Sequence, residues 1–126
     1  MLDPVRNVHA ALEHIAHPWQ PHRVATINNY ELKAVKLLGD FVWHKHDDTD
    51  ELFYVLSGHL RIDVRGSDGE VTVEMGPGDV YVVPRGVEHR PRAAEMVTAL
   101  LFEPSGVVNT GDAVGTELTS AVHELN

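Results

Sequence analysis

Two glycine-bounded stretches decide the fold: residues 39–58 read GDFVWHKHDDTDELFYVLSG, and residues 78–89 read GDVYVVPRGVEH. In the first stretch His44 and His46 are two residues apart, so on a strand both imidazoles leave the same face about 6–7 Å apart, a span that one metal ion can bridge. The acidic residues 47–50 are poor strand formers and predict a turn, after which Glu51 opens a returning strand near the two histidines. His89 closes the second stretch and is the candidate fourth ligand.

The candidate ligands are three imidazoles and one carboxylate, and the chain contains no cysteine that could add a thiolate. Nitrogen and oxygen ligands of this kind suit manganese, iron, cobalt, nickel, copper or zinc. The acidic residues 47–50 do not fit a calcium loop, because the glycine and the spaced acidic positions of that motif are absent. The pair of histidines alone is weak evidence, since nine histidines in 126 residues can produce it by chance. The second stretch is what strengthens the prediction.

Together the two stretches resemble the two motifs of the cupin family, roughly G-x5-H-x-H-x3,4-E-x6-G and G-x5-P-x-G-x2-H-x3-N. Eight positions agree at the motif spacings: His44, His46, Glu51, Gly58, Gly78, Pro84, Gly86 and His89. Two positions depart from the motifs. Gly39 precedes His44 by one residue fewer than usual, and Ala93 stands where the family often has asparagine. Neither departure removes a ligand.

This resemblance implies an all-β fold: a small antiparallel β-barrel of the cupin type, also called a double-stranded β-helix or jelly roll. It implies one divalent transition metal inside the barrel, held by His44, His46, Glu51 and His89. Cupins commonly pair into dimers, so the resemblance also implies a homodimer. We expect a single cupin domain over residues 1–126, with the motif region at residues 39–93 and a C-terminal loop and tail at residues 104–126.

Hydrophobic alternation agrees with a barrel. Residues 60–64 and 71–75 alternate apolar and polar side chains, which predicts two strands with one buried face, joined by a tight turn at Asp68-Gly69. Residues 80–83 are continuously apolar and predict a strand covered on both faces. Further strands are predicted at residues 24–27, 32–38 and 97–102, the first two joined by a turn at Asn28-Asn29.

A short amphipathic helix is predicted at about residues 4–16. Asp3 would be its N-cap and Pro4 its first residue, with an apolar stripe from Val5 to Ile15 and an end before Pro18. His14 and His17 lie three residues apart on this helix, but a solvated helical face explains them better than a metal site does.

The charge and hydropathy of the chain disfavour some classes of partner and location. Ten basic and nineteen acidic residues give a net charge of −9, which disfavours nucleic acid and anionic membranes as partners. No run of eighteen apolar residues exists, and the N-terminus lacks the order of a signal peptide. We therefore expect a cytoplasmic protein that binds a small molecule.

Three functions fit the predicted site. The first is a metal-dependent, dioxygenase-like enzyme that acts on a small oxygen-rich molecule, with Glu51 doubling as the catalytic proton acceptor. The second is a non-catalytic module that binds a metal or a small chelating or sugar-like ligand. The third is a metal-free isomerase or epimerase, which an intact set of four ligands disfavours. No separate catalytic base is evident: Tyr54 and Arg92 fall on outward faces by period-2 counting, and the direction of Tyr81 is open.

Overall fold

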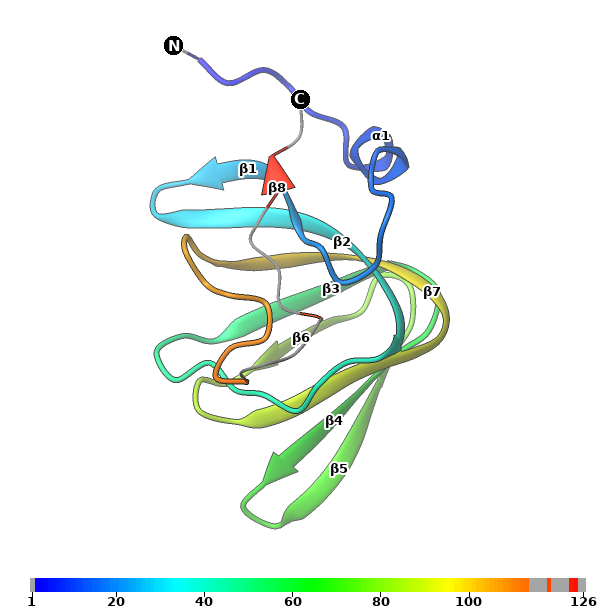
Figure 1. The fold of residues 1–126 in the computed structure, drawn as a ribbon, viewed down its shortest axis with the longest axis vertical. Coiled ribbons are helices and arrows are strands. Elements are labelled where there is room, and N and C mark those ends of the chain that lie inside the picture. The colour runs from blue at the N-terminus through cyan, green and yellow to red at the C-terminus, as the bar shows by residue number, and fades with distance from the viewer. Residues whose placement is uncertain (1, 114–117, 119–122, 125–126) are drawn as a thin grey trace.

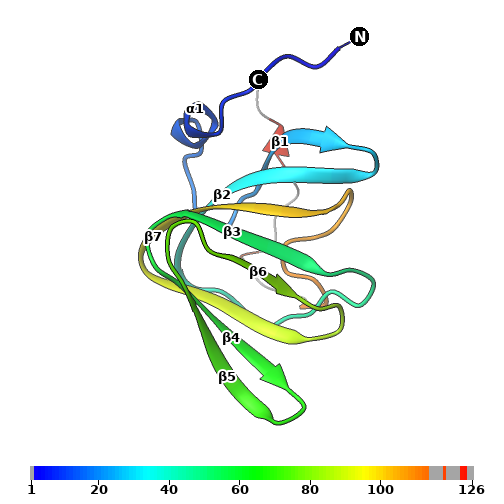
Figure 2. The same cartoon turned by 180° about the vertical axis from the view of Figure 1, so that it is seen from behind.

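The computed structural model describes residues 2–113, 118 and 123–124. Its regular secondary structure is almost entirely β-strand, with one short helix near the N-terminus (Figures 1 and 2). In chain order the described elements are α1 (Val8–Glu13), β1 (His22–Ile27), β2 (Tyr30–Asp40), β3 (Glu51–Ser57), β4 (Leu60–Gly66), β5 (Gly69–Met75), β6 (Val80–Val83), β7 (Glu88–Pro104) and β8 (His123–Glu124). The predicted all-β, antiparallel fold with a short N-terminal helix is confirmed.

Strand β7 organises the sheet. One of its edges follows β2, while the other pairs first with β4 and then with β3. The exposed residues 94–96 mark the bend between its two halves, and Figure 1 shows the strand curving from the β4–β5 hairpin toward β2. Because one strand serves both halves, the sheet wraps around a common interior. The sequence predicted a strand at His89 and another at residues 97–102, but not that both belong to one continuous strand, since Pro91 and the charged residues around it hide the connection.

The interior is filled by alternate residues of these strands. Val55, Leu60, Ile62, Val97 and Ala99 have no exposed surface, and they belong to one hydrophobic cluster inside the barrel. Their sequence neighbours face outward, as the period of two residues requires. A second, smaller cluster lies on the outside of β2, where α1 covers Ala34 and Val24.

The helix begins later than predicted. Asn7 is its N-cap, with its side-chain oxygen accepting a hydrogen bond from the backbone nitrogen of Ala10 at 3.0 Å, and Val5 lies fully exposed ahead of it. The prediction that Asp3 caps the helix and Pro4 opens it was therefore wrong. Asn7 caps the helix in place of Asp3 because its side-chain amide oxygen satisfies a backbone N–H group of the first turn. Leu12 and Ile15 are buried, as the predicted stripe requires.

Strand β6 is not covered on both faces. Val80 and Val82 are 53% and 43% exposed, although the continuous apolar run predicted their burial. Within the described residues β6 pairs only with β3, so it lies at an edge, with one face in the barrel and one face open. On the outer face of β4, a polar residue that the alternation predicted to be exposed is instead buried. Asp63 is only 2% exposed, because the side chains of Arg90 and Arg92 cover it.

The predicted turns are confirmed. Asn28 adopts φ +54° between β1 and β2, and Gly66 pairs with Gly69 across a two-residue turn between β4 and β5. The loop predicted after Pro104 is present over residues 105–113, whereas its last part and most of the predicted tail lie outside the described residues. In the described part of the chain, no helix is long and apolar enough to span a bilayer.

Candidate metal centre

The four predicted ligands lie together inside the barrel. Each of His44, His46, Glu51 and His89 offers a nitrogen or oxygen atom within 4.8 Å of those of the others. All four side chains are buried, with exposed fractions of 7% or less. The imidazole centroid of His44 lies 4.2 Å from that of His89 and 5.1 Å from that of His46. Residues up to 45 positions apart in the sequence therefore form one compact cluster.

The backbone around His44 and His89 fixes the site. The two residues form an isolated β-bridge, in which each backbone nitrogen donates to the carbonyl oxygen of the other at 3.0 and 2.8 Å. Glu51 is the first residue of β3 and reaches the cluster from another part of the barrel. His46 lies in the loop before β3, where its carbonyl oxygen accepts a hydrogen bond from Gly86. The expectation that His44 and His46 lie on one strand was wrong, because both lie between β2 and β3 and only His44 forms a β-bridge. The predicted proximity of Glu51 to the pair is correct, but β3 pairs with β6 and β7 and not with the segment of His44.

Hydrogen bonds orient the imidazoles. Nδ1 of His44 lies 2.9 Å from the carbonyl oxygen of Val42, and Nδ1 of His89 lies 3.0 Å from that of Val87. A carbonyl oxygen can only accept, so both Nδ1 atoms carry the proton. In the neutral rings both Nε2 atoms are then left with a lone pair, which is the arrangement that a metal ligand needs.

Glu51 faces the remaining ring nitrogens. Its Oε1 lies 3.2 Å from Nε2 of His89, and its Oε2 lies 3.3 Å from Nε2 of His46. Nε2 of His46 is buried and has no hydrogen-bond partner among the described residues. His89 meets an acceptor at both ring nitrogens, although a neutral imidazole has only one proton to donate. A cation at Nε2 resolves this conflict.

A divalent metal fits these residues. Ligand atoms bound at about 2.1 Å lie about 3–4 Å from one another around a metal ion, so the cluster needs only small side-chain shifts to close on one. The ion would use the lone pairs of Nε2 and would offset the negative charge of Glu51. Nitrogen and oxygen donors without sulfur admit manganese, iron, cobalt, nickel, copper and zinc alike.

The protonation states of His44 and Glu51 favour coordination. Burial, and then the positive charge of His89 when it is protonated, lower the pKa of His44 to about 4, so this ring is neutral at pH 7. Burial alone would lower the pKa of His46, but the adjacent Glu51 carboxylate outweighs burial and raises it. Burial opposes ionisation of Glu51, yet His46 and His89 beside it hold its pKa well below its usual range. At neutral pH the site therefore offers a carboxylate and at least one neutral imidazole.

Comparison with known proteins identifies the family. Residues 35–103, more than half of the chain, match the family model of the Cupin domain. This protein is a cupin. It is 31% identical over 80 residues to YdbB of Bacillus subtilis (strain 168), a match that covers 64% of this chain and 68% of YdbB. The structure is similar to that of a cupin-2 domain containing protein from Shewanella frigidimarina, with a TM-score of 0.74 and 39% identity over 79% of this chain and 94% of that one.

This cupin is also similar, over a shorter region, to an enzyme. It is 31% identical over 72 residues to the acireductone dioxygenase of Bacillus cytotoxicus, which covers 56% of this chain. The matched region is only 42% of the length of that dioxygenase. The two motifs lie within the region matched by the family model, so the predicted family and barrel type are confirmed. The extent of the domain over residues 1–126 stays a prediction.

A buried pair of ionisable side chains in the barrel was not predicted from the sequence. Nζ of Lys33 on β2 lies 2.9 Å from Oε1 of Glu103 on β7, and both side chains are only 1% exposed. Burial and the negative charge of Glu51 raise the pKa of Glu103 to about 8. A signal was available: period-2 counting from the buried residues Val97 and Leu101 places Glu103 on the inward face.

The other candidate residues lie away from the centre. Tyr54 is 36% exposed on the outer face, as predicted, and Arg92 binds Asp63 on the outside of the barrel. Tyr81, whose direction the sequence left open, is half-buried and packs against the main cluster. His14 and His17 are exposed and do not belong to the metal-ligand cluster.

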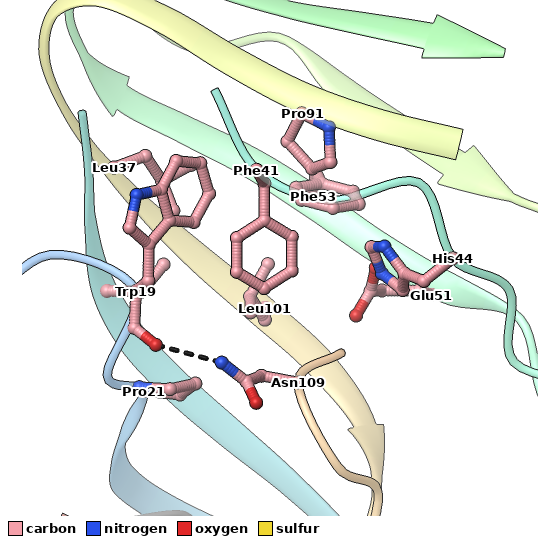
Figure 3. A pocket seen from close by; sticks show the side chains of 11 residues that line it. Trp19, Pro21, Leu37, Phe41, His44, Glu51, Phe53, Pro91, Leu101 and Asn109 are labelled. Atoms are coloured by element: carbon pink, nitrogen blue, oxygen red, sulfur yellow. Dashed lines mark hydrogen bonds between the residues drawn. The ribbon is translucent and has the colours of Figure 1, made fainter. Parts of the chain in front are cut away.

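A small apolar cavity of about 30 Å³ adjoins the cluster. His44 and Glu51 form one part of its wall, and aromatic and aliphatic side chains form most of the rest (Figure 3). This volume holds about two water molecules. The cavity gives the metal-ligand cluster an apolar neighbour, and neither Lys33 nor Glu103 lines it.

Proposed function

We propose that this cupin binds one divalent transition metal through His44, His46, Glu51 and His89 and acts as a metal-dependent, dioxygenase-like enzyme on a small oxygen-rich organic molecule. The observation that carries the proposal is that four buried side chains offer ligand atoms that all lie within 4.8 Å of one another. The metal is iron, manganese, nickel, copper, cobalt or zinc, because the donor set suits all six.

The residues of the chain have separable roles in this proposal. A bound divalent metal supplies Lewis acidity and, when it is redox-active, a site for oxygen chemistry. The Nδ1 hydrogen bonds of His44 and His89 hold both rings with Nε2 toward the centre. Glu51 keeps a negative charge there and is the candidate proton acceptor, because an oxygen of its carboxylate can take a proton from a bound molecule. The apolar cavity limits the access of water on one side.

The similarity to an acireductone dioxygenase supports oxygen chemistry on a small molecule. Four protein ligands on a metal that accepts five or six leave room for an oxygen-containing molecule to bind directly. An enolisable diketone, a phenol or a keto acid presents such oxygens.

A non-catalytic role in binding a metal or a small ligand is the second candidate. One observation favours it: among the described residues that line the cavity, only His44 and Glu51 have ionisable side chains, and both are candidate metal ligands. An enzyme with these residues would have no acid or base besides its own metal ligands. A metal-free isomerase fits less well, since it has no need for four converging ligands.

Oxygen consumption separates the two candidates. The protein is loaded with each of the six metals, and oxygen uptake is followed with diketones, phenols and keto acids, with the metal-free protein as the control. We expect uptake that requires the metal and disappears in His46→Ala. Stoichiometric metal without uptake for any compound would favour the non-catalytic role.

We further propose a homodimer, supported by an apolar outer face. Tyr54, Val80 and Val82 are exposed on the adjacent strands β3 and β6. Pairing of this face with a second copy would cover apolar area and an open sheet edge. Light scattering after size exclusion is expected to give twice the chain mass for the wild type and one chain mass for Val82→Arg. A monomeric wild type at micromolar concentration would contradict the dimer.

The cytoplasmic location stays a prediction.

A further inference from the structure

The cavity beside the metal-ligand cluster is closed by residues from distant parts of the chain. Trp19 precedes β1, Phe41 follows β2, and Leu101 lies on β7. Figure 3 shows the ring of Phe41 between Trp19 and His44. The Trp19 and Phe41 rings are stacked with their centroids 4.5 Å apart, and the Phe41 and His44 rings are nearly perpendicular with their centroids 5.3 Å apart. A continuous aromatic wall therefore leads from the cavity to a candidate ligand.

The cavity offers no hydrogen-bond donor to a polar group. Nε1 of Trp19 already donates to the carbonyl oxygen of Leu38 at 2.8 Å. Nδ2 of Asn109 donates to the carbonyl oxygens of Trp19 and Leu118 at 2.9 and 2.8 Å. Apart from His44 and Glu51, the other described side chains that line the cavity carry no N–H or O–H group. A hydroxyl placed away from His44 and Glu51 would lose its water without finding a side-chain donor, whereas a methyl group would gain contacts.

Trp19 adopts a backbone conformation that costs free energy, and its hydrogen bonds hold it there. It has φ +63°, a left-handed geometry that bulky residues adopt only where the surroundings impose it. Its backbone nitrogen donates to Lys36, its indole to Leu38, and its carbonyl oxygen accepts from Asn109. Three hydrogen bonds to two other segments thus fix one wall of the cavity. This strain supports a positioned binding wall over an accidental packing gap.

We propose that the molecule bound at the metal centre carries a small aliphatic group of two to four carbon atoms beside its metal-binding oxygens, and that this group occupies the cavity. The volume of about 30 Å³ sets the size, because displaced water and slight side-chain shifts make room for a short chain. The inference rests on the proposed function, since the metal would anchor the oxygen end of the molecule.

Three hydroxamates test this inference on the zinc-loaded protein. Butyrohydroxamate, 3-hydroxypropanohydroxamate and acetohydroxamate share one chelating head, and the first two differ only in a terminal methyl or hydroxyl group. We expect butyrohydroxamate to bind at least about tenfold more tightly than the hydroxylated analogue. We expect acetohydroxamate to bind about fifteenfold more weakly than butyrohydroxamate, at about fourfold for each missing methylene. Calorimetry measures all three affinities.

Two substitutions locate the binding of the aliphatic group. Leu101→Phe fills the cavity and is expected to reduce butyrohydroxamate binding to the level of acetohydroxamate, and Val35→Ile is a milder variant with a smaller effect in the same direction. Leu100→Phe is the matched control, because Leu100 is the neighbouring residue on the outside of β7. It is expected to leave the ratio of the two affinities unchanged.

The outcomes separate this inference from the proposed function. Equal affinities for the three compounds, tighter binding of the hydroxylated one, or zinc binding without any hydroxamate binding would overturn the inference and leave the metal site standing. Failure of the protein to bind zinc or any of the other five metals would overturn the proposed function itself.

Discussion

Replacing Asp63 by asparagine should destabilise the barrel by about 2 kcal/mol at pH 7. Asp63 is 2% exposed and accepts hydrogen bonds from Arg90, Arg92 and Thr72, at 2.8 Å from Arg90 Nη2 and from Thr72 Oγ1. Burial would raise its pKa, but these donors outweigh burial and lower the pKa from 3.8 to about 2. Because each tenfold change in acidity corresponds to about 1.4 kcal/mol, this difference is worth about 2 kcal/mol.

The pH dependence gives the effect a signature. A lowered pKa in the folded state contributes stability that is complete above the unfolded value of 3.8 and is lost as the pH falls toward 2. The free-energy difference between wild type and Asp63→Asn should therefore be constant between pH 7 and 5 and should shrink by about 1 kcal/mol at pH 3.

Urea unfolding at pH 7, 5, 4 and 3 measures this difference, and thermal unfolding should show a decrease of about 7 °C in Tm at pH 7. Asp68→Asn is the matched control, because Asp68 is exposed in the turn of the same hairpin. It should change stability by less than about 0.5 kcal/mol. A difference for Asp63→Asn that is equally small, or that stays constant down to pH 3, would refute the reasoning.

Three further predictions concern the interior. Lys33→Met should cost about 1–3 kcal/mol in urea unfolding at pH 7, because the Glu103 carboxyl, whose pKa is raised to about 8, is mostly protonated there and loses its buried hydrogen-bond partner, whereas Lys33→Met with Glu103→Leu should restore wild-type stability; a double variant as unstable as the single one would argue against this. Metal affinity, measured by competition with a chelator, should fall as the pH decreases from 8 to 5, because the raised pKa of His46 lets a proton compete with the metal first; a flat profile would contradict this. Gly111→Ala should weaken metal binding at least about tenfold, because its new Cβ would overlap the carbonyl oxygen of Lys45 and come within 3.1 Å of His44 Cδ2. Gly106→Ala, also at positive φ but in open space, is the control, and equal losses in both variants would refute the packing argument.

The sequence predicted the cluster of candidate ligands better than its surroundings. His44, His46, Glu51 and His89 could be found because metal ligation restricts both residue type and spacing. The strands at residues 60–66 and 69–75 could be found because apolar and polar residues alternate along them, although the predicted buried face of the second strand was wrong for Val71, which is 58% exposed, and only Met75 of that face is buried. These signals are local in the sequence.

What the sequence could not predict depends on tertiary contacts. The exposure of Val80 and Val82 follows from the edge position of β6, which their apolar run does not reveal. The burial of Asp63 requires arginines from another strand. Trp19 joins the cavity wall from a segment before β1 that no motif covers. Each of these features arises from pairing between distant residues.

Metal content tests the central claim most directly. The protein is reconstituted without oxygen with each of the six metals, dialysed to equilibrium and analysed by mass spectrometry, beside His46→Ala and the control His14→Ala, which changes an exposed histidine outside the cluster. The account predicts one metal ion per chain for the wild type and His14→Ala, and less than about one-tenth of that for His46→Ala, with all three proteins folded by circular dichroism. Metal-free wild type with all six ions, or unchanged metal content in His46→Ala, would contradict it.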